Sequence, residues 1–200
     1  MEGLDVAYRR FDSPLGRLLL AASRRGLLQV AYLADPQDED RVLERLAAAI
    51  SPRLVNAPRR LDRVACQLEE YFCGRRRRQR FQLALDLQLI DGFHRTVLTC
   101  LAQVPYGETV SYAALALTAG RPRAVRAVGS ACARNPLPIV IPCHRVLRSD
   151  GSLGGYRGGG QAKIRLLELE GARSSPRATA GARGRLLELE GSRAGVGGAR

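Results

Sequence analysis

The sequence predicts two parts, an α/β N-terminal half and a mainly α-helical C-terminal half. Between Val6 and Leu33, short apolar runs alternate with the turn sequences Ser13-Pro14-Leu15-Gly16 and Ser23-Arg24-Arg25-Gly26. This alternation is typical of a three-stranded antiparallel meander. From Asp38 the apolar residues recur at helical spacing instead, and the second half is dominated by that spacing.

Two amphipathic helices are predicted to follow the meander. Each carries its apolar residues on one face, namely Val42, Leu43, Leu46, Ala49 and Ile50 in the first helix, and Leu61, Val64, Ala65, Leu68 and Phe72 in the second. Each helix can therefore cover one side of the sheet. A strand-like run from Phe81 to Leu87 comes next, and we place the end of the N-terminal domain, residues 1–90, near Ile90.

The chain is strongly basic, with a formal net charge of +13 in 200 residues. Clustered cations favour a polyanionic partner. However, Lys163 is the only lysine, and a genome-wide preference for arginine would give the same charge. The run Arg75-Arg76-Arg77-Arg78-Gln79-Arg80 is interpreted as a solvated loop in preference to a phosphate site.

The sequence gives no indication of a membrane, a disulfide framework or a metal site. No apolar stretch approaches the roughly 18 residues that span a bilayer, and Glu2 and Asp5 interrupt any signal pattern. We therefore expect a cytoplasmic or nucleoid-associated protein. Five cysteines without regular spacing indicate free thiols, and neither Cys66 and Cys73 nor the two histidines match zinc-ligand spacing.

Three helices are predicted in the C-terminal half. The first spans Phe93 to Val104 and ends before the turn Pro105-Tyr106-Gly107. The second is capped by Ser111, runs through Thr118 and stops at Gly120. Pro122 can open the third, which extends to about Ala133.

The second and third of these helices form a candidate helix-turn-helix. The third contains Arg123, Arg126 and Arg134. Between them lie small residues that permit close backbone approach: Ala124, Ala127, Gly129, Ser130 and Ala131. DNA binding and ordinary packing of a helical hairpin both explain this composition, and the pattern alone leaves both open.

The segment from Asn135 to Val146 carries the main candidate for chemistry. Its prolines, placed around Ile139-Val140-Ile141, predict an extended path that ends at Cys143 and His144. Adjacent side chains on an extended chain point to opposite sides, so adjacency does not by itself establish a nucleophile and its base. A structural cysteine and a nucleophilic one remain open on this argument.

The tail, residues 172–200, is rich in Gly, Ala, Ser and Arg, and we predict that it is disordered. The sequence of residues 165–171 recurs at residues 185–191. A single short echo indicates a local duplication rather than a repeat architecture.

The pentapeptide Pro142-Cys143-His144-Arg145-Val146 resembles the active-site motif of the O6-alkylguanine-DNA alkyltransferases, or methylated-DNA–protein-cysteine methyltransferases. The resemblance extends over most of residues 68–171. Further segments match that family in order and spacing: Glu70-Tyr71-Phe72, Pro105-Tyr106-Gly107-Glu108-Thr109, Ser111-Tyr112, Arg126-Ala127-Val128-Gly129, Asn135-Pro136, Gly155-Tyr156, and Leu166-Leu167 through Glu170-Gly171.

The resemblance implies a ribonuclease-H-like N-terminal domain and a C-terminal domain, residues 91–171, that carries the helix-turn-helix and the active site. It implies a partner, double-stranded DNA containing O6-alkylguanine, whose minor groove receives the third helix. Arg126 would fill the gap left by the rotated nucleotide. The other DNA-contacting residues would be Ser111, Arg123, Ala124, Ala127 and Gly129. We expect a monomer that needs no cofactor.

The same resemblance implies one irreversible transfer of a methyl or other alkyl group to Cys143 from O6-alkylguanine and, as a further candidate, O4-alkylthymine. His144 would act as base through a water molecule, and Glu170 would orient His144. The Tyr112 hydroxyl would donate a hydrogen bond to the flipped base. The substrate pocket would also involve Val146 through its carbonyl, Arg157 through its amide, Tyr156, Pro138, and Asn135 as a hinge.

The chain departs from the family pattern at three places. No tryptophan lies near Leu98, Arg157 stands where a small residue is usual, and Glu190 duplicates Glu170 at the wrong distance from Cys143. Two rival functions are a non-catalytic damage-recognition protein and a cysteine hydrolase. The presence of Cys143 disfavours the first, and the lack of an oxyanion-hole motif disfavours the second.

Overall fold

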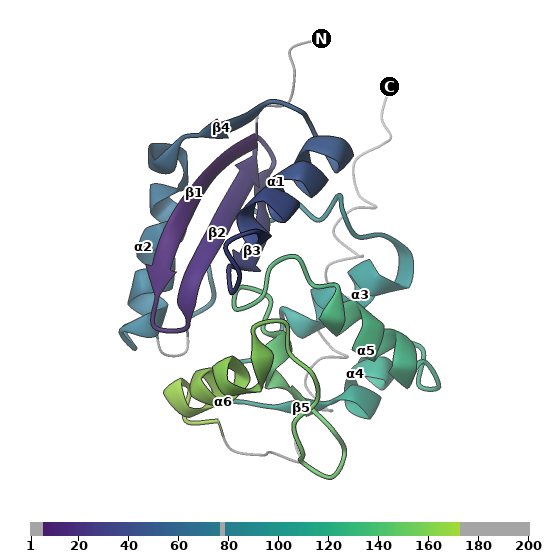
Figure 1. Cartoon of the computed structure of the whole chain (residues 1–200). Coiled ribbons are helices and arrows are strands. Elements are labelled where there is room, and N and C mark those ends of the chain that lie inside the picture. The colour runs from purple at the N-terminus through teal and green to yellow at the C-terminus, as the bar shows by residue number, and fades with distance from the viewer. Residues whose placement is uncertain (1–5, 77–78, 173–200) are drawn as a thin grey trace, which may run out of the picture.

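The computed structural model describes residues 6–76 and 79–172. They form a sheet with helices against it, followed by a group of helices packed below the sheet in the view of Figure 1. The predicted disordered tail, including the second Leu-Leu-Glu-Leu-Glu segment, lies outside the described residues apart from Ala172.

The predicted meander is confirmed, but the sheet has a fourth strand. Its strands are β1 (Val6–Ser13), β2 (Gly16–Ser23), β3 (Gly26–Tyr32) and β4 (Leu54–Asn56), in the order β3-β2-β1-β4. The β1–β2 and β2–β3 pairs are antiparallel, whereas β4 runs parallel to β1. A strand of three residues is too short to show a periodic pattern, which is why the sequence did not predict β4.

The two predicted helices cover opposite faces of the sheet, as Figure 1 shows for α1 (Asp38–Ala49) and α2 (Asp62–Phe72). Alternate residues of one strand separate the two faces: Leu19 belongs to the apolar cluster of α1, and Leu20 to the cluster of α2. A short 3₁₀ helix, η1 (Pro58–Leu61), leads into α2. Burial on both faces explains the nearly continuous apolar run in β2.

The prediction of a strand from Phe81 to Leu87 is wrong, because in this segment only Leu85 forms a β-bridge, to Leu27 of β3. Beside it, the Leu27 amide donates to the Ala84 carbonyl at 2.8 Å. Further along β3, the Val30 amide donates to Pro136 of the C-terminal half, at 2.8 Å. The edge of β3 is thus shared between two segments, and neither extends into a regular strand.

The arginine run is not simply a solvated loop. Arg76 is buried and donates through Nη1 to Glu70 Oε2 at 2.6 Å and through Nη2 to the Arg80 carbonyl at 2.7 Å. Arg80 in turn donates to the Gln103 carbonyl at 3.3 Å. Arg76 and Arg80 thus link the segment between the two halves to α2 and to the residues that follow α3. Residues 77–78 lie outside the described part.

The C-terminal half contains four α-helices among its described residues: α3 (Gly92–Leu101), α4 (Tyr112–Thr118), α5 (Val125–Ala133) and α6 (Gly159–Leu169). Two short parallel strands, β5 (Val110–Ser111) and β6 (Val146–Leu147), and the 3₁₀ helix η2 (Cys143–Arg145) complete it. Ser111 caps α4 as predicted, because its hydroxyl accepts from the Ala114 amide at 3.0 Å.

Two predicted helix boundaries are corrected. The first helix ends at Leu101 rather than Val104. The third begins at Val125 rather than Pro122, because residues 121–124 form a turn closed by the Ala124 amide on the Arg121 carbonyl at 2.9 Å. Arg123 therefore precedes the helix, and Ala124 is its N-cap.

One apolar cluster runs through both halves, joining the α2 side of the sheet to α3, α4, α5 and α6. Since the halves share this cluster, their relative placement is fixed by side-chain packing as well as by hydrogen bonds. Within the described residues, no helix combines the length and apolar character needed to cross a bilayer.

Candidate active site

The segment that leads to Cys143 is folded back rather than extended, so the predicted extended path is wrong. The Asn135 side chain closes it: Nδ2 donates to the Ile141 carbonyl at 2.8 Å, and Oδ1 accepts from the Leu137 amide at 3.0 Å. Ile139 adopts φ = 75°, a conformation that non-glycine residues rarely take. The turn between these contacts includes Pro138, which is buried.

Strand β3 of the N-terminal half supports the site from outside. Both the Val30 amide and Gln29 Nε2 donate to the Pro136 carbonyl, at 2.8 and 2.9 Å. The hydroxyls of Tyr32 and Tyr156 lie 2.9 Å apart. The turn before Cys143 and the loop that carries Tyr156 are thus both fixed to the sheet.

The Glu170 carboxylate lies at the centre of the site, and its side chain has no exposed area. Its Oε1 accepts from the Tyr71 hydroxyl at 2.6 Å and from Arg145 Nη2 at 2.8 Å. Its Oε2 accepts from Arg145 Nε at 2.8 Å and the Gly107 amide at 3.2 Å. Although burial raises its pKa, the hydrogen bonds and charges of His144 and Arg145 hold the pKa of Glu170 far below its usual range.

His144 completes this cluster, with Nε2 2.8 Å from Glu170 Oε1. An ionised carboxylate can only accept, so the proton of neutral His144 resides on Nε2. Its Nδ1 is left as the basic atom, buried and without a hydrogen-bond partner among the described residues. Burial lowers the pKa of His144, and Arg145 and Lys163 lower it further, against the opposing effect of Glu170. The imidazole is therefore neutral near pH 7.

Cys143 is 4% exposed and is a protonated thiol at rest. Burial raises its pKa to about 11, although the Asn135 side chain and the charges of Lys163 and Arg157 act in the opposite direction. A thiol is a poor nucleophile, so reaction requires that a nearby base take its proton. The raised pKa of Cys143 therefore favours loss of the thiol proton during the reaction over a thiolate that is present beforehand.

Lys163 is a site residue that the sequence analysis missed. Its Nζ donates to the Val146 carbonyl at 2.6 Å and to the Gly154 carbonyl at 3.4 Å, and the side chain is fully buried. The Val146 carbonyl was predicted to take part in the substrate pocket, and a carbonyl oxygen that accepts from Lys163 has a second lone pair for a further hydrogen bond. A lone lysine between Ala162 and Leu166, on the buried face of α6, was the available signal.

The remaining pocket residues lie around Cys143. Tyr112 is half-buried, and its hydroxyl packs so closely on Gly154 that a Cβ there would collide with it. Burial, Cys132 and Cys143 raise the pKa of Tyr112, which keeps it a hydrogen-bond donor. Tyr156 is also half-buried, with its ring nearly perpendicular to that of His144 at a centroid distance of 6.3 Å. Arg157 is exposed, yet its charge reaches Cys143.

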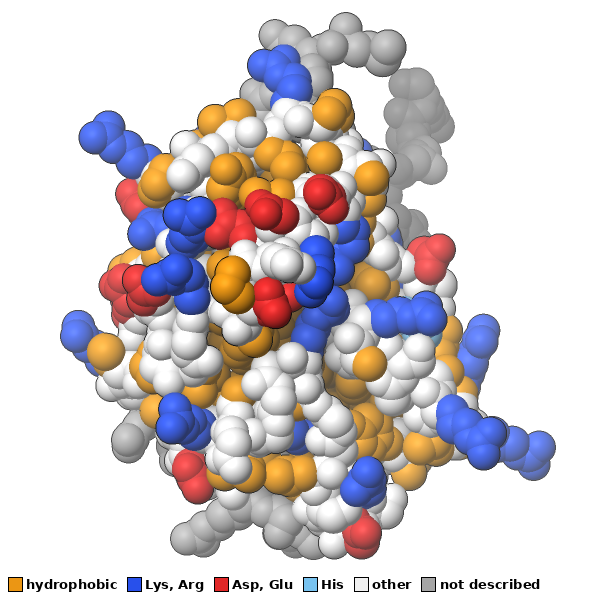
Figure 2. Space-filling view, in the orientation of Figure 1, with side chains coloured by type: hydrophobic (Ala, Val, Ile, Leu, Met, Phe, Trp, Pro, Cys, Tyr) orange, Lys and Arg blue, Asp and Glu red, His pale blue; other side chains and the backbone are white. Residues whose placement is uncertain are grey.

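The predicted DNA-contacting residues lie on and before α5. Arg123 and Arg126 are exposed, whereas Ala124, Ala127 and Gly129 are half-buried. The Ser111 hydroxyl is used as the cap of α4. Figure 2 shows arginines spread over one face of the molecule with acidic side chains between them, so the total charge alone does not define a DNA surface.

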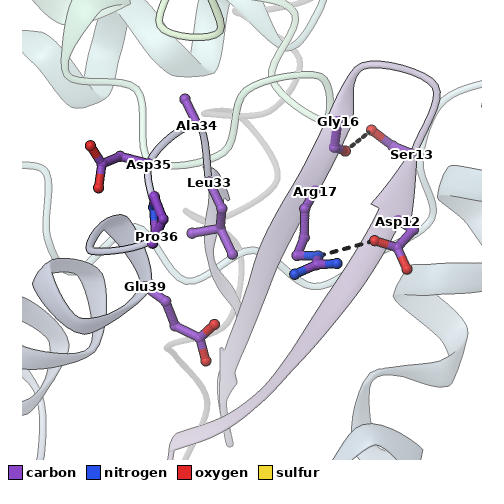
Figure 3. A pocket seen from close by; sticks show the side chains of 9 residues that line it. All are labelled: Asp12, Ser13, Gly16, Arg17, Leu33, Ala34, Asp35, Pro36 and Glu39. Atoms are coloured by element: carbon purple, nitrogen blue, oxygen red, sulfur yellow. Dashed lines mark hydrogen bonds and ion pairs between the residues drawn. The ribbon is translucent and has the colours of Figure 1, made fainter.

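A separate pocket in the N-terminal half, drawn in Figure 3, contains none of these residues. Two of its three carboxylates have basic partners, since Asp12 pairs with Arg17 at 3.2 Å and Glu39 with Arg10 at 2.6 Å, and the third, Asp35, accepts from the Gln37 amide at 2.9 Å. It carries no chemistry related to Cys143. No group of three His, Cys, Asp or Glu side chains suited to a metal ion occurs in the described part of the chain.

Fold and site together define a protein with a buried cysteine, a neutral histidine held by a carboxylate, and a helix-turn-helix beside them. A family model described as 6-O-methylguanine DNA methyltransferase, ribonuclease-like domain, matches residues 6–87. Another, described as 6-O-methylguanine DNA methyltransferase, DNA binding domain, matches residues 92–172. The chain belongs to this family, which confirms the predicted ribonuclease-like and helical domains.

Comparison with individual proteins supports the same family assignment. The chain is 39% identical over 163 residues to the methylated-DNA–protein-cysteine methyltransferase of Methanosarcina barkeri, covering 82% of this chain and 96% of that protein. It is 41% identical over 169 residues to the bifunctional transcriptional activator/DNA repair enzyme Ada of Escherichia coli, covering 84% of this chain but 46% of Ada. The crystal structure of Mycobacterium tuberculosis OGT in complex with DNA matches with a TM-score of 0.71 and 36% identity, covering 85% of this chain and 96% of that one.

The buried charges make Glu170→Gln strongly destabilising. Removing one partner of a buried ion pair leaves the other uncompensated, at a cost of about 3 to 5 kcal/mol. Because the pKa of Glu170 is depressed, its contribution is present above the ordinary carboxyl pKa of 4.5 and is lost as the pH falls below it. Urea unfolding should therefore show a large difference from wild type at pH 7 that narrows below about pH 4.5.

The matched control is Glu108→Gln, at an exposed carboxylate in the same half. It should change the free energy of unfolding by no more than about 0.5 kcal/mol. A Glu170→Gln effect equally small, or one independent of pH, would show that the carboxylate is not the charged centre of the site.

Proposed function

We propose that this protein repairs alkylated DNA by moving a methyl or other alkyl group from O6 of guanine to Sγ of Cys143. A sulfur–carbon bond forms, the bond between carbon and O6 breaks, and guanine leaves with that electron pair. The observation that carries the proposal is a buried Cys143 next in sequence to His144, whose basic Nδ1 has no hydrogen-bond partner among the described residues while Glu170 holds Nε2.

The protonation states of the site residues support this chemistry. The Cys143 thiol, with its pKa raised to about 11, gives its proton to His144 Nδ1 through a water molecule as sulfur attacks. Glu170 stabilises the imidazolium that results. The raised pKa of Tyr112 keeps its hydroxyl protonated, so it can donate to the departing base. The acceptor is the protein itself, so no cofactor is needed and each molecule acts once.

The burial of Cys143 favours nucleotide flipping, because a base inside the duplex stack cannot reach a nucleophile that is 4% exposed. We place the minor groove against α5, where Ala127 and Gly129 allow close approach, and assign the space of the extruded nucleotide to exposed Arg126. A cytoplasmic or nucleoid-associated monomer has the required access to double-stranded DNA. O4-alkylthymine is a further candidate substrate.

Intact-mass spectrometry tests the proposal directly. After mixing with excess duplex containing one O6-methylguanine, each protein molecule should gain one methyl group, and peptide mapping should place it on Cys143. Cys143→Ser should gain none while its affinity for the duplex falls by less than about tenfold, or 1.4 kcal/mol. Methylation of Cys132, or continued turnover, would contradict the proposal; turnover is the behaviour of the rival hydrolase.

Arg126→Ala should slow transfer from duplex much more than transfer from a free O6-alkylguanine base, because only the duplex must be held unstacked at a cost of a few kcal/mol. Arg134→Ala is the control, at an exposed arginine that caps the other end of α5 and is not among the predicted DNA contacts. Single-turnover rates on both substrates decide the matter. Equal slowing on the two substrates would remove the extrusion role, and a salt-dependence slope lower by about one unit would assign Arg126 to a phosphate.

A further inference from the structure

Tyr71 of the N-terminal half contacts the candidate active site of the C-terminal half. It lies in the last turn of α2 and is 2% exposed. Its hydroxyl donates to Glu170 Oε1 at 2.6 Å across 99 residues of sequence. Its ring is packed by three aromatic neighbours, with centroids 5.4 to 6.1 Å away, namely Phe72, Phe81 and Tyr106. The ring therefore has little freedom, and the hydroxyl is aimed at the carboxylate.

The oxygen that Tyr71 contacts is the one that His144 uses. Glu170 Oε1 is 2.6 Å from the Tyr71 hydroxyl and 2.8 Å from His144 Nε2. Arg145 Nη2 also donates to Oε1, but Arg145 contacts both carboxylate oxygens and so does not distinguish them. Tyr71 is the donor that fixes Oε1 from the side of the N-terminal half.

We propose that Tyr71 is a positioning residue for alkyl transfer, which holds the Glu170 carboxylate against His144 and makes the N-terminal half part of the reaction machinery. Its effect on rate rests on the proposed function. Its effect on His144 does not, because the shared oxygen is a property of the folded protein.

Sharing Oε1 has a definite electrostatic consequence. Each donor to a carboxylate stabilises its charge and weakens its attraction for the others. Without the Tyr71 hydroxyl, Glu170 attracts the Nε2 proton more strongly, which favours the imidazolium and raises the pKa of His144. The other charged or titratable groups near His144 are unchanged by this substitution: Cys143, Arg145, Tyr156 on its loop, and Lys163 on α6.

The test is Tyr71→Phe, with Tyr106→Phe as the matched control. Tyr106 contacts the same aromatic cluster, and its hydroxyl donates to the Leu169 backbone carbonyl at 2.9 Å, one residue from Glu170. Both variants lose one hydroxyl next to the site, but only Tyr71→Phe takes a donor from the carboxylate. Similar melting temperatures would show that both keep the fold.

The first measurement is the titration of His144 by NMR with ¹³C-labelled histidine, where His94 serves as an internal control because the chain has two histidines. One neutral hydrogen bond corresponds to a shift of about 0.5 to 1 pH unit. We expect the pKa of His144 to rise by this amount in Tyr71→Phe and to stay unchanged in Tyr106→Phe. An unchanged His144 in Tyr71→Phe would overturn the proposal.

The second measurement is the pH profile of single-turnover transfer. Neutral His144 is the base, so the acidic limb of the profile should move to higher pH by the same amount in Tyr71→Phe. A slower plateau with an unmoved limb would indicate a packing role only and overturn the proposal. If the unmodified protein transfers no alkyl group but the pKa of His144 still rises in Tyr71→Phe, the proposed function fails while the contact between Tyr71 and the His144–Glu170 pair stands.

If Tyr71→Phe does not fold, the unmodified protein supplies the test. With ¹³Cζ-tyrosine labelling, the Tyr71 signal should move with the titration of His144, because both donors share Oε1. A Tyr71 signal that does not respond to that titration would overturn the proposal.

Discussion

The buried carboxylate of Glu170 is the interaction on which the site depends. An unpaired charge at a position without exposed area would be prohibitively costly, so the surrounding donors are required for folding as well as for chemistry. They come from α2, the turn before β5, and η2. A single side chain therefore fixes the relative positions of segments that are distant in sequence, and it orients His144 at the same time.

The N-terminal half contributes to this arrangement through two further contacts. Strand β3 holds Pro136 through the Val30 amide and Gln29, and Tyr32 meets Tyr156. These contacts support the two segments that flank Cys143. The sheet is thus a scaffold that limits how far the cysteine and the pocket loop can move, which is the preorganisation that an attack on a single carbon atom requires.

The sequence predicted those features that have a local cause. The meander follows from its turn residues, and the start of α4 from the hydroxyl of Ser111. Cys143, His144 and Glu170 were found through resemblance to a family, since adjacency in the chain gave no reason to pair the first two. Their roles remain predictions, while the structure shows how they are placed.

What the sequence did not predict depends on contacts between distant segments. Strand β4 forms because β1 offers a free edge, and residues 81–87 fail to form a strand because β3 also binds Pro136. Arg76 was predicted to lie in a solvated loop, but it is buried and pairs with Glu70. Lys163 and Tyr71 were assigned no role from the sequence, because their contacts with the Val146 carbonyl and with Glu170 form only in the folded chain.

The central claim is that burial keeps His144 neutral, while Glu170 holds its proton on Nε2 and so leaves Nδ1 to take the Cys143 proton. The most direct measurement is a two-bond ¹⁵N–¹H correlation spectrum of the histidine-labelled protein at pH 7. We expect the coupling pattern of a neutral ring protonated at Nε2 for His144. A pattern of the Nδ1-protonated tautomer, or of an imidazolium at that pH, would contradict the account.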